Sequence, residues 1–298
     1  MINDVIHSAF IMTTPVLLAA LGGLLNRVGG LVNIGLDSMM LVGALLGIIV
    51  SSATGSWGLA LVAAAIAGAV LGLLMSLIVT RLDANEIIVG LGFNVAVAGL
   101  VRFFLKSVYG TAGTLNLPNV VMMPRLHIPL VADIPVFGAI LSGHDLLTWA
   151  AWILVPVTAW FLSRTRLGLR LRAAGAAPQA ARALGLDPLT LRDGSTVFAG
   201  LMAGLAGAYL SIGVVGIFNE GITAGRGFIA LAAFYFGRNR PWLTAFGALI
   251  FGFFDAVQIR LQGRGVPAEL VQTLPYIMVI VILTVVALAA RRSKPKGA

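Results

Sequence analysis

The sequence predicts an all-α protein that crosses a lipid bilayer many times. Hydrophobic residues make up 59% of its 298 residues, charged residues make up only 10%, and the mean hydropathy is +1.00. The runs Trp57–Thr80, Gly194–Gly216 and Leu270–Ala290 contain no ionised side chain. Each reaches the roughly 20 residues that a helix needs to span a hydrocarbon core about 30 Å thick. We therefore expect one polytopic helical bundle over residues 1–298, with about eight to ten spans.

Nine apolar segments follow one another along the chain, and each is expected to be a helix. They are approximately Ser8–Leu25, Leu31–Val50, Trp57–Thr80, Glu86–Leu105, Leu146–Leu162, Gly194–Gly216, Gly227–Gly237, Trp242–Ile259 and Leu270–Ala290. The start of the chain, Met1–His7, lacks the basic region of a cleavable signal, and no A-x-A site closes the first segment.

Orientation is predicted by the basic connector at residues 164–193, which holds six arginines and no aromatic residue. Basic loops of membrane proteins stay in the cytoplasm. Alternation of the spans then puts the tail Arg291–Lys296 inside, together with Arg27, Arg81, Arg238 and Arg240. Fourteen of the 20 Lys and Arg fall on the cytoplasmic side in this way, and the N-terminus falls outside. The net charge of +9 follows from the same rule and does not indicate nucleic acid.

The longest external segment is residues 106–145. Four prolines prevent a continuous helix there: Pro118, Pro124, Pro129 and Pro135. A segment this long in a compact protein is usually functional or disordered. We interpret it either as a docking surface for an external partner or as a solvated connector.

Two segments have the pattern of interrupted helices. Gly227–Gly237 has 11 residues, about 16 Å of helix or half of the membrane, and follows the polar run Asn219–Arg226. The second segment opens in a related way with Gly29–Ala44. The two run in opposite directions in the predicted topology. Interrupted helices at corresponding positions of two inverted halves indicate a transport pathway.

Small residues recur at a spacing of four in several spans, where they allow close approach of helices in lipid. The pairs are Gly43/Gly47, Gly68/Gly72 and Gly200/Gly204. Packing within one subunit is the favoured interpretation, and a dimer interface is the alternative.

Two carboxylates lie well inside apolar segments, where an ionised group costs about 2.5 kcal/mol or more. Asp37 is in the second segment and Asp255 in the eighth. They face a polar pathway, or they have a structural role as a helix cap or the partner of an arginine; the structural role is slightly favoured. Asn33 and Asn94 are neutral hydrogen-bonding groups that suit either a polar ligand or contacts between helices.

The sequence contains no catalytic pattern and no predicted metal site. Cysteine is absent, and His7, His127 and His144 lie outside the apolar cores of the segments. The motifs H-E-x-x-H, G-x-S-x-G and G-x-x-x-x-G-K-[ST] are missing. If ATP drives this protein, a separate chain binds it.

Taken together, several motifs give the chain a specific resemblance to a known family over nearly its whole length. It resembles the permease subunits of bacterial ABC importers, in the nucleoside and simple-sugar branch related to ribose and branched-chain amino-acid permeases. The motifs are GGLVNIGLDSMMLVGA (29–44), ANEIIVGLGFN (84–94), RTRLGLRLRAAG (164–175), AARALGLDP (180–188), GLMAGLAGAYLSIG (200–213) and TAGRGFIALAAFYFGRNRPW (223–242).

This resemblance implies partners and a location. Such permeases work with an ATPase subunit, a second paralogous permease and an extracytoplasmic substrate-binding protein, in the bacterial cytoplasmic (inner) membrane. The chain itself would then be no enzyme and would carry no cofactor, since ATP is bound and hydrolysed by the partner.

The resemblance also implies a coupling helix at Ala174–Leu186 that sits in a groove of the ATPase. The matching positions are Gly175, Pro178, Ala180, Ala181, Arg182 and Gly185. Gly185 is expected to end this helix in a left-handed conformation, and Arg182 is expected to pair with acidic residues of the ATPase.

Two departures from the family pattern stand out. The family more often has Glu-Asn where this chain has Ala176-Ala177, which weakens the case for a charged contact there. The family often reads GLEG where this chain has Gly35-Leu36-Asp37-Ser38, so the carboxylate is one methylene shorter.

The expected function is translocation of nucleosides or related purines and pyrimidines by an ATP-driven importer. A monosaccharide permease is the first alternative, and an ion-coupled secondary transporter that uses Asp37 and Asp255 as ion sites is the second. The residues predicted to line the path are Asn33, Asp37, Glu86, Asn94, Glu220 and Asp255.

Overall fold

The computed structural model describes residues 2–126, 143–261, 277 and 284. Seven of its helices are long and apolar enough to cross a membrane, and an eighth apolar helix is shorter. These eight correspond to the first eight predicted segments, which confirms an all-α polytopic bundle. The ninth predicted segment, Leu270–Ala290, lies outside the described residues except for Ile277 and Thr284.

The long helices account for most of the described chain. They are α1 (Ile2–Val28), α2 (Leu36–Thr54), α3 (Trp57–Arg81), α4 (Glu86–Phe104), α7 (Leu146–Arg164), α10 (Pro188–Ala208) and α12 (Pro241–Leu261). Two of them continue as wider π-helical turns, α4 into η1 (Leu105–Tyr109) and α10 into η2 (Tyr209–Val215). The short helices are α8 (Arg166–Ala176), α9 (Pro178–Ala183) and α11 (Arg226–Phe236).

Two short antiparallel strand pairs lie outside the helices. One joins β1 (Thr114–Leu115) to β4 (Phe218–Asn219), and the other joins β2 (Arg125–Leu126) to β3 (His144–Asp145). The predicted external segment is thus helical up to Tyr109 and is tied by β1 to the chain that precedes α11.

The start of α10 differs from the predicted boundary. The helix begins at Pro188, six residues before Gly194, so the end of the predicted connector is helical. The Asp187 carboxylate accepts a hydrogen bond from the Leu189 N–H at 3.1 Å and caps the helix, and Pro188 occupies its first turn. The apolar run used to predict this span begins only at Gly194, because the first residues of α10 include Thr190, Arg192 and Asp193, which are polar but helical.

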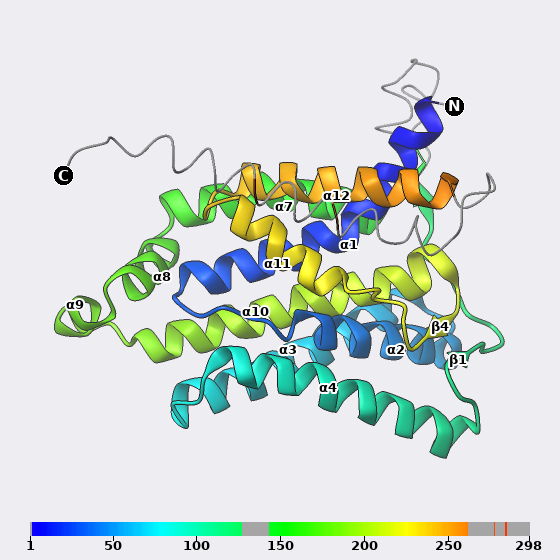
Figure 1. Ribbon diagram of the computed structural model, residues 1–298, viewed down its shortest axis with the longest axis horizontal. Helices are drawn as coiled ribbons and strands as arrows, with labels where there is room; N and C mark the ends of the chain where they lie inside the picture. The colour runs from blue at the N-terminus through cyan, green and yellow to red at the C-terminus, as the bar shows by residue number, and fades with distance from the viewer. Residues whose placement is uncertain (1, 127–142, 262–276, 278–283, 285–298) are drawn as a thin grey trace.

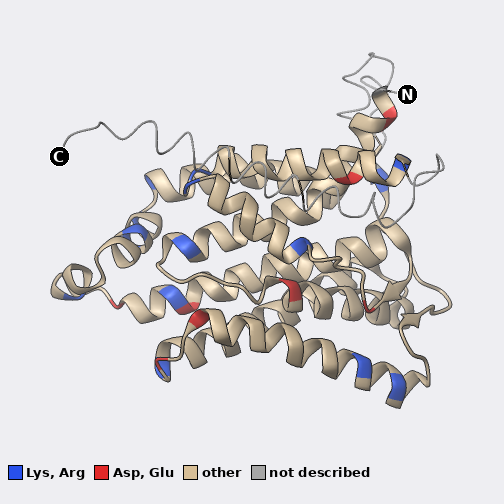
Figure 2. Ribbon diagram, in the orientation of Figure 1, with Lys and Arg blue, Asp and Glu red and all other residues tan. Residues whose placement is uncertain are grey.

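The helices run along the long axis of the molecule, with α8 and α9 at one end and the N-terminus at the other (Figure 1). The end with α8 and α9 is called the connector end below. Basic residues gather there on several elements, although some also lie at the opposite end (Figure 2). This arrangement agrees with the predicted placement of the connector and the N-terminus on opposite sides of the membrane.

Glycines bring α3 and α10 into backbone contact. A Cβ atom built on Gly200 would overlap the carbonyl oxygen of Gly68, and one built on Gly68 would overlap the carbonyl oxygen of Gly200. Gly204 is held in the same way by Ala64, and Gly43 of α2 packs on Gly204. The predicted small-residue surfaces are therefore internal, which confirms packing within one subunit.

This contact predicts a difference between two glycine substitutions. Gly200→Ala should force α3 and α10 apart and lower the melting temperature of the purified protein, at a cost of about 1–3 kcal/mol for overpacking. Gly99→Ala in α4 is the matched control, because nothing lies within 4 Å of a Cβ atom there. Thermal unfolding in detergent measures both, and equal melting temperatures for the two variants would contradict the close contact.

Candidate functional site

Two interrupted helices begin next to each other inside the bundle (Figure 1). Helix α2 starts at Leu36, after the non-helical segment 29–35, and runs away from the connector end. Helix α11 starts at Arg226 and runs for 11 residues toward the connector end. The two predicted interrupted helices of opposite direction are thus present. Helix N-termini carry unpaired N–H groups and a partial positive charge, so their meeting point attracts an anion.

The anion at this meeting point is the side chain of Asp37. It lies in the first turn of α2, and its Oδ1 accepts a hydrogen bond from the Gly227 N–H of α11 at 3.0 Å. Its Oδ2 accepts a second one from the Thr223 hydroxyl at 3.0 Å. Asp37 therefore caps the other interrupted helix while sitting in the positive end of its own. The structure thus shows the helix-capping contact predicted as one alternative for this carboxylate, and its place on the path stays a prediction.

Gly227 is the residue that makes this cap possible. A Cβ atom there would lie 2.5 Å from the Cα of Asp37, which is far inside van der Waals contact. The preceding turn uses left-handed backbone at Ala224 (φ 44°) and Gly225 (φ 70°). Left-handed backbone is costly for alanine, and here it precedes the turn that directs the Gly227 N–H at the carboxylate.

Helix α4 supplies the partners of the segment before α2. The Asn94 side chain accepts from the Ser38 N–H at 3.0 Å and donates to the Ile34 carbonyl at 3.0 Å. The Glu86 carboxylate accepts from the Val32 N–H at 3.0 Å. Non-helical backbone at membrane depth needs such partners because lipid offers none. Both side chains were predicted on the path; the structure places them in contact with this backbone.

The two other predicted acids form ion pairs. Asp255 of α12 accepts from Arg226 at 2.7 Å, and both side chains are largely buried, at 16% and 15% exposed. Glu220 accepts from Arg102 at 2.8 Å and from the Gly113 N–H at 3.1 Å, toward the end opposite the connector. Pairing with an arginine is therefore confirmed as the structural role of Asp255.

Asn33 is the predicted path residue with an unmet polar atom. Its side chain is fully buried, its Nδ2 donates to the Met39 sulfur at 3.5 Å, and its Oδ1 has no hydrogen-bond partner among the described residues. A buried acceptor without a partner costs about 1–3 kcal/mol. Such a group next to an interrupted helix is a candidate contact for a polar ligand, and that role stays a prediction.

The connector consists of α8 and α9. The Thr165 hydroxyl accepts from the Gly168 N–H at 3.0 Å and caps α8, and Pro178 opens α9. The Gly185 N–H donates to the Arg182 carbonyl at 2.9 Å and the Leu186 N–H to the Ala181 carbonyl at 3.0 Å. Gly185 has a φ of 76°, so the predicted left-handed ending is confirmed.

The predicted coupling residues divide into two groups. Ala180, Arg182 and Gly185 are exposed, and Pro178 is half-buried. Ala181 is only 2% exposed and Gly175 packs on the end of α1, so neither has a side chain free to enter a groove of another protein. Sequence reasoning missed Leu184, which is 81% exposed on the same tip. The sequence did carry a signal for it, because Leu184 is an apolar residue directly before the glycine that ends α9.

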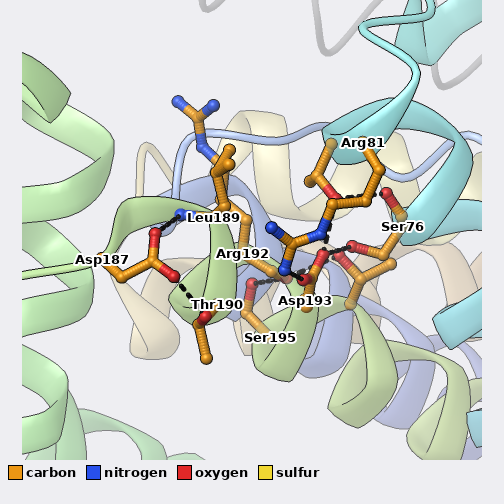
Figure 3. A network of polar contacts seen from close by, with 10 residues as sticks. Ser76, Arg81, Asp187, Leu189, Thr190, Arg192, Asp193 and Ser195 are labelled. Atoms are coloured by element: carbon orange, nitrogen blue, oxygen red, sulfur yellow. Dashed lines mark hydrogen bonds and ion pairs between the residues drawn. The ribbon is translucent and has the colours of Figure 1, made fainter.

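The far end of the connector is fixed to α3, as Figure 3 shows. Asp193 of α10 accepts hydrogen bonds from Ser76 at 2.6 Å and Thr80 at 2.8 Å, and it pairs with Arg81 at 3.0 Å. This network was not among the predicted sites, because residue 193 was assigned to the loop.

Asp187 lies one and a half turns before this network (Figure 3). Hydrogen bonds from the Thr190 hydroxyl and the Leu189 N–H hold the pKa of the Asp187 carboxyl below its ordinary value. The cap of α10 is therefore ionised at neutral pH. The α9–α10 junction is held at both of these points.

The connector also touches the backbone that leads to Asp37. A Cβ atom on Gly30 would lie 2.9 Å from the Cα of Gly175, and Arg192 donates to the Gly29 carbonyl at 3.2 Å. Only five residues lie between Gly30 and Leu36, the first residue of α2. The connector therefore contacts the non-helical segment, and this segment leads directly to the first turn of α2, which carries Asp37.

Comparison with known proteins now bears on this arrangement. A family model described as the permease component of branched-chain amino acid transport systems matches residues 5–283. The chain belongs to this permease family. It is accordingly a multi-pass membrane protein, in agreement with its seven long apolar helices.

Three relatives illustrate the similarity. The nucleoside ABC transporter permease protein NupC of Lactococcus lactis is 30% identical over 94% of this chain and 90% of its own length. The guanosine ABC transporter permease protein NupQ of Bacillus subtilis is 30% identical over 99% and 95%. The putative glucose ABC transporter permease protein TsgC13 of Haloferax volcanii is 32% identical over 84% and 75%. No solved structure gives a significant match.

The Asp37 cap predicts a large effect from a small substitution. Asp37→Asn removes the charge at two helix N-termini and turns an N–H₂ group toward one of the two donors. Loss of a buried acceptor costs about 1–3 kcal/mol, so the melting temperature should fall by several degrees and transport should fall with it.

Asp83→Asn is the matched control, because Asp83 is exposed in the turn before α4 and asparagine tolerates its left-handed backbone (φ 52°). Thermal unfolding and uptake in membrane vesicles measure both variants. An Asp37→Asn protein with wild-type stability would show that the two helix N-termini do not depend on this carboxylate.

Proposed function

We propose that this chain is the membrane-spanning permease of an ATP-driven importer that brings nucleosides or related purines and pyrimidines into the cell. The observation that carries the proposal is end-to-end similarity to permeases named for nucleoside and guanosine transport, each covered over at least 90% of its length. The polar groups near the interrupted helices, such as the unpaired Asn33 oxygen, suit a ligand rich in amide and hydroxyl groups.

A monosaccharide is the competing substrate, because a relative of comparable identity is named as a putative glucose permease. Nucleosides are preferred because the similarity covers 90% and 95% of the two relatives named for nucleoside and guanosine transport, but only 75% of the relative named for glucose. Sugars and nucleosides share hydroxyl groups, so the distinction lies in recognition of the base.

The proposal includes three partners in the cytoplasmic membrane or beside it. A separate ATPase subunit binds and hydrolyses ATP, so this chain needs no cofactor of its own. A second, paralogous permease completes the path, as the pair of relatives named NupC and NupB in Lactococcus lactis suggests. An extracytoplasmic binding protein delivers the substrate.

Coupling is proposed to start at the exposed tip of α9. Arg182 and Leu184 enter a groove of the ATPase, and the buried side of α9 passes the movement to α8 and α10. Helix α10 is locked to α3 by glycine contacts and by Asp193, so the two move as one body. The contact of Gly175 with Gly30 then shifts the segment that positions Asp37.

An ion-coupled secondary transporter is disfavoured because both carboxylates proposed as its ion sites already have hydrogen-bond or ion-pair partners. Asp37 accepts hydrogen bonds from a helix N-terminus, and Asp255 is paired with Arg226. A cation would have to displace these donors, and the arginine would repel it.

The coupling proposal predicts the effect of reversing the chemistry of the α9 tip. Replacing Arg182 and Leu184 together by Glu should lower ATPase recovery and uptake at least tenfold, because burial of one leucine alone contributes about 1.5–3 kcal/mol. The permease should remain folded in the membrane, since both positions are exposed.

Arg170→Glu on α8 serves as the control, because Arg170 is exposed on the same connector but lies outside α9. Co-purification of the ATPase and vesicle uptake are measured for each variant. If the double variant retained both, α9 would not be the coupling helix.

The function itself is tested by affinity purification of the tagged chain from native membranes, followed by mass spectrometry and uptake assays. An ATPase and a second permease are expected to be recovered, with ATP-dependent uptake of labelled guanosine or uridine that unlabelled glucose does not inhibit. Uptake of glucose instead would establish the monosaccharide alternative. Uptake by this chain alone that a protonophore abolishes would establish a secondary transporter.

A further inference from the structure

A cationic cavity lies at the connector end of the bundle. Its volume is about 760 Å³, and it is bounded by the ends of α1 and α7, by α8 and by the turn between α11 and α12. Four arginines line it, Arg27, Arg172, Arg238 and Arg240, and no Asp or Glu does among the residues that the structure describes. The ion pairs Arg81–Asp193, Arg102–Glu220 and Arg226–Asp255 do not involve these arginines. The cavity therefore concentrates positive charge that described carboxylates do not neutralise.

Two of these arginines, Arg27 and Arg172, are held in place by contacts that leave most of their donors available. The Arg27 guanidinium lies 3.8 Å from the centre of the Tyr235 ring and donates to the Phe234 carbonyl at 3.4 Å. Arg172 donates to the Leu162 carbonyl at 3.5 Å. Each guanidinium has five N–H donors, so one such contact leaves a fork that fits phosphate oxygens.

The other wall of the cavity is apolar and belongs to membrane-spanning helices. Ala159 and Leu162 of α7 and Trp242 and Leu243 of α12 line it. Trp242 is 62% exposed in the first turn of α12, beside Arg240. Tryptophan next to arginine at the end of a spanning helix is typical of the boundary between lipid tails and headgroups. The cavity thus joins a cationic pocket to an apolar surface at that boundary.

We propose that this cavity binds the headgroup of an anionic phospholipid, with its phosphate on the arginines and its acyl chains along α7 and α12. Basic pockets between spanning helices on the cytoplasmic side have the chemistry that such headgroups need. A lipid with two phosphates, such as cardiolipin, fits four arginines best. The proposal depends on the membrane location of the chain and not on its transported substrate.

A lipid suits this place better than an acidic surface of a soluble protein. Helix α9 projects beyond the ends of the spanning helices, whereas the α11–α12 turn lies level with them (Figure 1). A soluble partner would meet α9 first, and a headgroup would sit at the level of the cavity. Since Arg172 and Gly175 of α8 line the cavity, a bound headgroup also joins the connector to α12.

The test compares two double variants that remove the same charge. Arg238→Gln with Arg240→Gln empties half of the cationic lining in an exposed turn, without touching Arg27, which holds the end of α11. Arg166→Gln with Arg170→Gln is the control, on exposed positions of α8 outside the cavity. Both are purified as full chains in a neutral detergent. Cardiolipin, phosphatidylcholine and inorganic phosphate are each titrated, with native mass spectrometry and thermal unfolding as readouts.

Cardiolipin is expected to bind and stabilise the wild type more than phosphatidylcholine does. The cavity variant should lose about tenfold or more of its apparent affinity for cardiolipin, since each basic residue near an anionic surface contributes about one factor of five. The control should keep wild-type affinity. Equal losses in both variants, or equal stabilisation by inorganic phosphate, would overturn the proposal. So would unchanged cardiolipin binding by the cavity variant; if the ATPase also failed to co-purify with that variant from membranes, the cavity would be a protein docking surface.

Discussion

The hydrogen bonds between Asp37 and the N-terminus of α11 are the constraint on which the centre of this permease depends. Two helices that begin inside a membrane leave their first N–H groups unpaired at a depth where no water is available to satisfy them. For α11, the Asp37 carboxylate accepts hydrogen bonds of 3.0 Å from the Gly227 N–H and the Thr223 hydroxyl. Asn94 and Glu86 of α4 satisfy the backbone before α2 in the same way. The polar residues of the membrane interior thus stabilise the two interrupted helices. An opening for substrate must leave these hydrogen bonds in place.

The stiff part of the molecule surrounds this centre. Glycines 68, 200 and 204 allow α3 and α10 to touch backbone to backbone, and Asp193 ties their ends together through Ser76, Thr80 and Arg81. Close packing and buried hydrogen bonds make such a pair resist bending. In the proposed coupling, a displacement applied at α9 is transmitted along α10 and is not absorbed at the junction. The backbone contact of Gly175 with Gly30 would carry it to the non-helical segment before α2.

The connector end combines two kinds of surface with different partners. The tip of α9 presents Arg182 and the exposed Leu184 at the end predicted to be cytoplasmic, as a helix that docks on another protein would. The cavity behind it presents arginines and Trp242 at the level of the headgroups. Because α8 lines the cavity and directly precedes α9, the proposed lipid binding and ATPase docking would act on adjoining short helices. The lipid composition of the membrane would then influence how firmly the connector is held when the ATPase moves.

The sequence by itself determined the class of the protein, the order of eight described spans, the position of the basic connector and the left-handed ending at Gly185. These are local properties, because hydropathy, charge and the conformational freedom of glycine act over a few residues. Only the tertiary structure decided what the buried polar residues do. Asp37 finds its partners near residue 225, Asn94 near residue 36 and Asp193 near residue 78. The choice between a path residue and a cap for Asp37, or between a contact residue and a packed one for Ala181, depends on which distant helix lies opposite. Periodicity within one segment carries no information about that neighbour, since the packing of helices in lipid is set by the shapes of both surfaces at once.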